Sequence, residues 1–318
     1  MTRNPYPVTF HPLPMVRPWG GQRLPRMFGV SAEGGPTGEV WVVSAHPHGE
    51  SVVANGPFAG RRLAEVVADA PRAYLGEALQ ERFPLLVKFL DATENLSVQL
   101  HPGDSFARAH EGDFGKTEAW LILEAPVGGE VILGDTFPDR AHYEEAVRSG
   151  RLLDHLHRRP VSPGEIVLVP AGTLHAVLAG TTLLEVQEAS DVTYRVFDWG
   201  RQGRELHLDK AAHVRFSGSE ADLDHTPAPR PVFDGEEARR ALSCPYFSLA
   251  KIGLASGDHA ARRSEAPSLV IVISGHGALW FGDEDIPLGP GRAVLVPAGL
   301  GKWGVRARGP LEAAAVTW

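Results

Sequence analysis

Two residues with polar, metal-binding side chains, Gln99 and His101, lie two positions apart in the stretch SVQLHPGDSF (97–106). The stretch begins as an apolar, strand-like run and ends in a Pro-Gly-Asp turn. Residues two apart in a strand point to the same face of a sheet, so the amide oxygen and the imidazole nitrogen can converge. Buried polar groups need partners, and a metal ion is a partner that this pair could share.

Two further residues complete a candidate ligand set. Glu118 opens the next strand-like run, after GDFGKT, and His175 follows the tight turn PAGT. A single strand histidine is more often a hydrogen-bonded structural residue, but four such residues at the ends of adjacent predicted strands favour one site. Two imidazoles, one carboxylate and one amide oxygen suit a borderline cation, Zn²⁺ before Fe²⁺, Mn²⁺ or Co²⁺. We therefore predict that Gln99, His101, Glu118 and His175 bind a metal ion.

The other close histidine pairs are weaker candidates. The pair in HLH (155–157) falls in RLLDHLHRR (151–159), where we expect a short helix, and helical positions two apart point in different directions. The pair in HPH (46–48) falls in a predicted loop because proline and glycine surround it. We expect surface positions for these residues, except that His46 could line the pocket.

Three cationic residues point to an anionic substrate. Lys116 lies two positions before the acidic ligand and therefore on the same side, and Lys88 interrupts the apolar run PLLVKFLDA. A lysine in such a run is costly unless it is paired or faces an anion. Arg195, in SDVTYRVFDWGR, is either in a structural ion pair with Asp191 or Asp198, or free to bind an anion such as a phosphate ester.

Short strands joined by turns must position these residues. The chain contains 35 glycines and 26 prolines, and its apolar runs are short and β-branched. We expect helices within 61–76 and 138–150. We expect strands in the first two thirds of the chain at 38–45, 84–90, 96–101, 118–125, 130–134, 165–170 and 182–187.

Bulk composition describes an ordinary globular protein without a disulfide framework. Of 318 residues, 43% are hydrophobic and 22% are charged, and the formal net charge of −8 argues against a general nucleic-acid surface. The single cysteine, Cys244, cannot form an internal disulfide. No apolar signal segment opens the chain, and the most apolar run, SLVIVIS, is too short to span a bilayer. We expect a cytoplasmic monomer or homodimer without nucleic-acid or membrane partners.

An internal repeat indicates two copies of one β fold. GEIVLVPAGTLH (164–175) and GRAVLVPAGLGK (291–302) share the same Gly, Pro and Gly spacing, and only the last position changes, from His175 to Lys302. Because lysine is a poor replacement for an imidazole ligand, we expect no metal in the second copy. We predict a metal-binding unit with inserted helices at 1–221, a linker at 222–241 and a smaller all-β unit at 242–318.

These motifs resemble the cupin superfamily. The first repeat fits the second cupin motif, G-x5-P-x-G-x2-H, without a gap, and Gln99 stands where many cupins have a histidine. The chain also resembles the type I mannose-6-phosphate isomerase family in its short bacterial form, through the stretches LSVQLHP, GKTEAW, VPAGTLHAV and SDVTYRVFDWGR. Four more stretches match this family: RPWGG, VWVVSAHP, PLLVKFLDA and GRELHLDKA. The resemblance therefore covers residues 15–215 well and the second unit more loosely. It implies a mainly β, double-cupin protein.

The resemblance also implies roles for individual residues. It implies one Zn²⁺ per chain on Gln99, His101, Glu118 and His175, and catalytic roles for Arg195, Lys116 and Asp191. It places Lys88 and Ser97 on the phosphate side of a phosphosugar substrate. The implied reaction interconverts mannose 6-phosphate and fructose 6-phosphate through an enediolate. Neutral Lys116, Asp191 or a water on the metal could carry the proton, and Arg195 would stabilise negative charge because a guanidinium hardly ever deprotonates.

Other functions stay open on sequence alone. A metal-dependent cupin dioxygenase would use iron or copper and O₂, although the two lysines favour a phosphorylated substrate. A non-catalytic sugar-binding cupin would bind without turnover, although the intact ligand set and Arg195 argue against it. The same isomerase chemistry on another phosphosugar is the nearest alternative.

Overall fold

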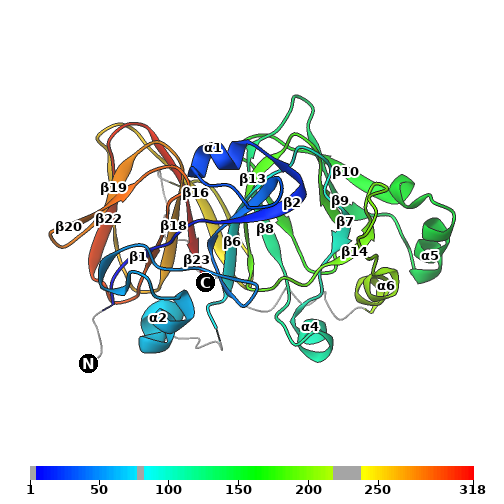
Figure 1. The fold of residues 1–318 in the computed structure, drawn as a ribbon, viewed down its shortest axis with the longest axis horizontal. Helices are drawn as coiled ribbons and strands as arrows, with labels where there is room; N and C mark the ends of the chain where they lie inside the picture. The colour runs from blue at the N-terminus through cyan, green and yellow to red at the C-terminus, as the bar shows by residue number, and fades with distance from the viewer. Residues whose placement is uncertain (1–4, 77–81, 218–237) are drawn as a thin grey trace.

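A computed structural model describes residues 5–76, 82–217 and 238–318 of the chain. Four large antiparallel sheets follow one another along the long axis of the molecule, and the helices α5 and α6 cover the outer sheet at one end (Figure 1). The two sheets nearest α5 and α6 form an N-terminal unit, and the other two form a C-terminal unit. The mainly β, two-unit architecture expected from the sequence is therefore confirmed.

The N-terminal unit consists of a six-stranded and a five-stranded sheet. The six-stranded sheet runs β11-β8-β13-β6-β3-β2, with bounds Ile166–Val169, Glu118–Glu124, Thr182–Glu188, Leu85–Asp91, Thr37–Val43 and Leu13–Gly21. The five-stranded sheet runs β10-β9-β12-β7-β14, with bounds Leu156–Pro160, Glu130–Asp135, His175–Val177, Val98–Leu100 and Tyr194–Phe197. A small hairpin pairs β4 (Ala45–His46) with β5 (Gly49–Glu50).

The six-stranded sheet is buried on both faces. One face, with Val87 and Val186, packs against the C-terminal unit, and the other, with Leu90, Trp120 and Leu183, faces the five-stranded sheet. Every residue of β3, β6 and β13 is buried as a result. Double burial explains why these segments read as continuous apolar runs rather than as alternating ones.

Helices cover the remaining faces and edges. Their bounds are α1 Arg23–Phe28, α2 Leu63–Asp69, α3 Pro71–Leu75, α4 Asp104–His110, α5 Arg140–Arg148 and α6 Leu208–Phe216, with 3-10 turns at Gly56–Phe58 and Leu152–His155. Tyr143 and Ala146 of α5 and Ala211 and Val214 of α6 pack in one cluster with Ile132 of the five-stranded sheet. None of the described helices is long and apolar enough to cross a membrane.

The helix expected at 151–159 is only partly present. The 3-10 turn ends at His155, and β10 follows and pairs with β9 along Leu156–Pro160. An open strand edge offers this segment more hydrogen bonds than a short helix would, so tertiary pairing overrides the local pattern. The helix expected at 138–150 is confirmed as α5, and the Asp139 side chain caps it by accepting the backbone N–H of His142.

The C-terminal unit encloses a packed apolar interior. Its six-stranded sheet runs β1-β21-β18-β23-β16-β15, with bounds Val8–Thr9, Ala293–Val296, Ser268–Ser274, Leu311–Thr317, Ser248–Leu254 and Ala238–Ser243. Its four-stranded sheet runs β17-β22-β19-β20, with bounds His259–Arg263, Lys302–Ala307, Gly277–Phe281 and Glu284–Leu288. Leu279, Trp303 and Val305 are among the side chains that fill the space between them.

The unit boundaries remain a prediction. The linker expected at 222–241 lies mostly outside the described residues, and its last four positions belong to β15. The first described strand also belongs to the C-terminal unit, because Val8 and Thr9 of β1 pair with Leu295 and Val294 of β21.

Candidate metal centre and active site

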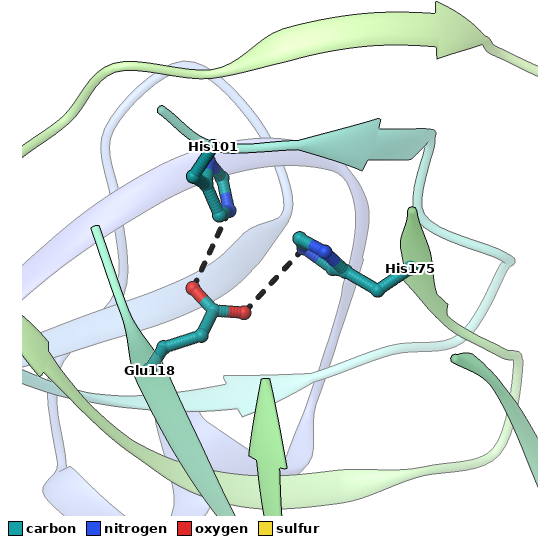
Figure 2. Close-up of side chains that lie close together, drawn as sticks. All are labelled: His101, Glu118 and His175. Atoms are coloured by element: carbon teal, nitrogen blue, oxygen red, sulfur yellow. Dashed lines mark ion pairs between the residues drawn. The ribbon is translucent and has the colours of Figure 1, made fainter. Parts of the chain in front are cut away.

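Three of the four predicted ligands converge between the two sheets of the N-terminal unit. His101 lies directly after β7, Glu118 opens β8 in the facing sheet, and His175 opens β12. Their side chains point toward one another, with Glu118 between the two imidazoles (Figure 2). Glu118 Oε2 lies 3.4 Å from His101 Nε2, and Glu118 Oε1 lies 3.5 Å from His175 Nε2. All three side chains are buried, and their ligand atoms lie within 4.8 Å of one another.

The hydrogen bonds of the two histidines fit a metal ion. His101 Nδ1 lies 2.8 Å from the Val192 carbonyl, and His175 Nδ1 lies 2.9 Å from the Thr173 carbonyl. Carbonyls only accept, so both Nδ1 atoms carry the proton and both Nε2 atoms present a lone pair to the centre. His175 Nε2 is buried and has no hydrogen-bond partner among the described residues. A buried acceptor of this kind is what a metal ion would satisfy.

Gln99 lies in register with two other site residues. In the five-stranded sheet β7 runs between β12 and β14, and Gln99 pairs with His175 on one side and Arg195 on the other. Gln99 Oε1 accepts a hydrogen bond from Ser97 Oγ at 2.9 Å, and Arg195 Nε donates to the same hydroxyl at 3.3 Å. Gln99 and Arg195 therefore lie in one row of the sheet, and the Ser97 hydroxyl connects their side chains.

Lys116 lies at the centre of the ligand group. Its ammonium donates to His101 Nε2 at 2.8 Å and makes a short contact with Glu118 Oε2. Burial, followed by the Lys116 charge, lowers the pKa of His101 to about 3, and burial also lowers the pKa of His175. Burial alone would raise the pKa of Glu118, but the charge of Lys116 holds that pKa well below its ordinary value. Neutral imidazoles and an ionised carboxylate are the forms that bind a cation.

Alternating charges continue from Lys116 to the mouth of the cavity. Glu185 Oε1 lies 3.7 Å from Lys116 Nζ and 3.0 Å from Lys88 Nζ, and Lys88 Nζ lies 4.0 Å from Glu39 Oε2. Arg17 then contacts both Glu39 oxygens, at 2.9 and 3.0 Å. Against the effect of burial, Lys88 and Arg17 lower the pKa of Glu39 to about 2, and Glu185 and Glu39 raise the pKa of Lys88. Each buried charge thus has an opposite charge next to it.

A cavity of about 450 Å³ opens onto this centre. The predicted residues that line it are Lys88, Ser97, Gln99, Lys116, Glu118, His175, Asp191 and Arg195. Among the described residues, no carboxylate forms an ion pair with Arg195, whose guanidinium donates to Ser97 Oγ and to the Glu205 carbonyl. Burial, together with the charge of Arg204, lowers the pKa of Arg195. The structural ion pair considered for Arg195 is therefore absent from the described part of the chain, although Asp198 lies near enough to attract its charge, and the guanidinium lines the cavity.

His46, which we expected to line the pocket, is not among the residues that line this cavity. His46 is buried beside the cavity rather than on its lining, and its Nε2 lies 3.3 Å from Asp113 Oδ2. The neighbouring His48 lies 3.0 Å from Asp191 Oδ2 at the cavity mouth. Turn geometry explains the difference, because the β4–β5 hairpin directs His46 toward the loop before β8.

Several cavity residues escaped the sequence analysis, among them Arg17, Glu39, Glu185 and Arg204. A signal existed for Glu185, because a carboxylate inside the apolar run TLLEVQ is as unusual as Lys88 inside PLLVKFLDA. The two residues are direct cross-strand partners on β13 and β6. Glu39 carried the same signal at the start of EVWVV.

Two family profiles match the chain in separate regions. The profile described as phosphomannose isomerase type I, catalytic domain, matches residues 16–117. The profile described as mannose-6-phosphate isomerase, cupin domain, matches residues 237–316. The two profiles thus cover parts of both structural units.

Individual relatives match along nearly the whole chain. A mannose-6-phosphate isomerase of Streptococcus mutans is 37% identical over 90% of both chains. Mannose-6-phosphate isomerase ManA of Bacillus subtilis is 37% identical over 93% of this chain and 95% of its own. The crystal structure of a Bacillus subtilis mannose 6-phosphate isomerase superposes with a TM-score of 0.84 at 32% identity, covering 98% and 99% of the two chains.

Proposed function

Since the chain belongs to the type I phosphomannose isomerase family, we propose that it is a zinc-dependent isomerase that interconverts mannose 6-phosphate and fructose 6-phosphate. One observation carries the proposal to this chain. His175, Gln99 and Arg195 lie in one row of the sheet, so the candidate metal centre and a guanidinium without a carboxylate in contact open into the same cavity. The proposal includes the expected cytoplasmic location.

One Zn²⁺ would be held by Gln99, His101, Glu118 and His175. When bound, the ion acts as a Lewis acid that polarises the sugar oxygens where negative charge develops. Three of these ligands are neutral and one is a carboxylate, so the site keeps a net charge of about +1, unlike a cysteine-rich structural site. The lone pairs on both Nε2 atoms and the unsatisfied His175 Nε2 support this assignment.

The reaction moves one proton between neighbouring carbons. A base removes the C2 proton of open-chain mannose 6-phosphate, the electron pair forms the C1–C2 double bond, and the C1 carbonyl oxygen takes the negative charge of the enediolate. A proton then moves from O2 to O1, C2 becomes the carbonyl carbon, and the proton held by the base is added at C1 to give fructose 6-phosphate. Lys116 and Asp191 are the candidate proton carriers because both line the cavity. Arg195 would stabilise the enediolate oxygens, since its guanidinium has no carboxylate partner among the described residues.

The charges along the cavity suggest how the phosphate would be bound. Lys88 is next to two carboxylates, Glu185 and Glu39, so much of its charge is already compensated. Arg195 and Ser97 lie at the other side of the cavity, where the Ser97 hydroxyl connects Gln99 with Arg195. We therefore retain Ser97 and Lys88 as contacts on the phosphate side of the substrate and keep Arg195 for the enediolate oxygens.

A coupled assay of mannose 6-phosphate isomerisation, with and without chelator, tests the function. We expect activity that a chelator abolishes and that added Zn²⁺ restores. A metal-loaded protein without isomerisation would contradict the proposal. Oxygen consumption in the same preparation would then indicate a dioxygenase, and calorimetric sugar binding without turnover would indicate a binding protein.

A further inference from the structure

Asp113, in the loop before β8, accepts hydrogen bonds from several separate segments of the chain. Asp113 Oδ2 accepts from Ser190 Oγ at 3.2 Å and from the Asp191 backbone N–H at 3.4 Å. Asp113 Oδ1 accepts from the Phe114 N–H at 2.9 Å and makes a short contact with an Arg82 amino group. Asp113 is not part of the cavity lining, so these contacts are its connection with the site.

The β4–β5 hairpin adds a further donor to Asp113, the His46 side chain, and the hydrogen bonds of His46 show which ring nitrogen carries the proton. The His48 backbone N–H donates to His46 Nδ1 at 3.2 Å, so Nδ1 carries a lone pair and the proton is on Nε2. His46 Nε2 then donates to Asp113 Oδ2 at 3.3 Å. This explains why His46 is buried beside the cavity and not on it.

The segment next to Asp113 supports two parts of the proposed site. Ser190 Oγ accepts the Val192 N–H at 3.3 Å, and the Val192 carbonyl accepts the proton of His101 Nδ1. Between them, Asp191 lines the cavity and contacts His48. Arg82 donates to the Ala189 carbonyl as well, and its guanidinium lies 4.1 Å from the centre of the Phe114 ring.

We propose that Asp113 is a positioning residue: its carboxylate fixes the segment 189–192 and thereby places Asp191 at the cavity and holds the Val192 carbonyl that orients His101. Any effect of Asp113 on catalysis rests on the proposed isomerase function. A partner of a metal-binding histidine typically influences metal affinity or activity 10- to 100-fold.

The carboxylate form is essential to this arrangement. Both oxygens face only donors: Arg82 and the Phe114 N–H on one, His46, Ser190 and the Asp191 N–H on the other. Asparagine would turn one oxygen into a donor that faces other donors, while glutamate would keep two acceptors on a longer chain. The pKa of Asp113 agrees, since hydrogen bonds from His46 and Arg82 outweigh burial and lower it.

The test compares Asp113→Asn, Asp113→Glu and a matched control, Asp135→Asn. Asp135 resembles Asp113 because it binds an arginine, Arg215, through both oxygens at 2.9 and 3.1 Å and accepts the Phe137 N–H. It contacts helix α6 and does not line the cavity. For each variant we would measure Zn²⁺ affinity by chelator competition, hydrogen exchange in a peptide covering 187–193, and kcat at saturating Zn²⁺.

We expect Asp113→Asn to lower Zn²⁺ affinity or kcat by about 10- to 100-fold and to accelerate exchange in 187–193. We expect Asp113→Glu to recover most of the lost Zn²⁺ affinity or kcat and most of the protection from exchange. Asp135→Asn should leave Zn²⁺ affinity, kcat and exchange within about twofold of the wild type. If Asp113→Asn does not fold, Asp113→Glu alone should give intermediate values in both measurements.

Unchanged exchange in 187–193, or values of both Zn²⁺ affinity and kcat within twofold of the wild type, would overturn the inference. The same losses in Asp135→Asn would overturn it too, because the effect would then be general destabilisation. Wild-type turnover reports separately on the proposed function. Without it, faster exchange and weaker Zn²⁺ binding in Asp113→Asn would still support the positioning role.

Discussion

The segments 164–175 and 291–302 repeat the same glycine and proline spacing, yet they lead into different interiors. In the N-terminal unit the repeat ends at His175, which is buried and points toward the other two residues of the candidate metal centre, His101 and Glu118. In the C-terminal unit it ends at Lys302, which is exposed at the start of β22, and the next residue, Trp303, turns inward. Equal spacing in the sequence therefore does not place equivalent side chains inside.

The comparison indicates that an apolar interior and a buried ligand group exclude each other in the described part of the two units. Trp303 packs with Leu279, Val305 and other apolar side chains in the C-terminal interior, which leaves little room for a polar centre. In the described part of the chain, a group of histidine and acidic side chains arranged for a metal is found at His101, Glu118 and His175. The interior of the N-terminal unit contains buried charged side chains around a cavity, whereas the interior of the C-terminal unit is filled with apolar side chains.

Matched substitutions at the two ends of the repeat would test this difference most strongly. We expect His175→Ala to lose metal and at least about 10³-fold in kcat, since Lewis-acid stabilisation is worth several kcal/mol. Lys302→Ala should keep both within about twofold, because Lys302 is exposed in the other unit. Metal analysis and the coupled assay measure the two effects, and loss of metal in Lys302→Ala would break the comparison.

A cavity in the C-terminal interior should affect stability and not chemistry. Trp303 is 1% exposed, so we expect Trp303→Ala to lower the free energy of unfolding by about 3–5 kcal/mol. Below its melting temperature, the variant should keep the wild-type kcat. Urea unfolding and the coupled assay at low temperature check this, and a selective loss of kcat would mean that the C-terminal unit takes part in the reaction.

Arg195→Ala would test the guanidinium charge in the N-terminal cavity. Removing one preorganised donor from a developing oxyanion costs about 10²–10³ in kcat, and we expect a loss of this size with metal content and melting temperature retained. Arg306→Ala in the C-terminal unit is the control, because Arg306 forms an exposed pair with Asp285. Near-normal kcat in Arg195→Ala would contradict the role proposed for Arg195.

The sequence predicted those parts of the site that depend on local pattern. Same-face spacing placed Gln99 with His101. The tight turn before His175 and the strand start at Glu118 put these two residues at strand ends as well, so all four could be grouped as candidate ligands. The strands were predictable because short apolar runs end at glycine or proline. Lys88 and Glu185 show the limit, since each looked isolated until strand pairing made them direct neighbours.

Partners that are distant in the sequence could not be predicted. Asp113 contacts His46, 67 residues earlier, and Ser190, 77 residues later, and no local pattern links these positions. The misplaced helix at 151–159 has the same cause, because β10 forms only where β9 offers an edge. Long-range packing therefore decided which of the conspicuous residues line the cavity and which support it.

The buried carboxylates of the N-terminal unit should make it the acid-sensitive part of the molecule. Glu39 has a pKa lowered from 4.5 to about 2, which corresponds to a stabilisation of roughly 3 kcal/mol. A lowered pKa stabilises the fold above pH 4.5, and this contribution is lost as the pH falls toward 2. We expect the stability difference between wild type and Glu39→Gln, measured by urea unfolding, to shrink over this range.

A carboxylate in the C-terminal unit provides the matched comparison for Glu39. Glu312 pairs with Lys251 at 2.9 Å, but its side chain is 39% exposed, so we expect Glu312→Gln to cost less than about 1 kcal/mol at any pH. Parallel pH dependence in wild type and Glu39→Gln would show that Glu39 is not the group that titrates. A larger acid effect for Glu312→Gln would reverse the comparison, because the packed unit would then depend more on charge than the unit with the cavity.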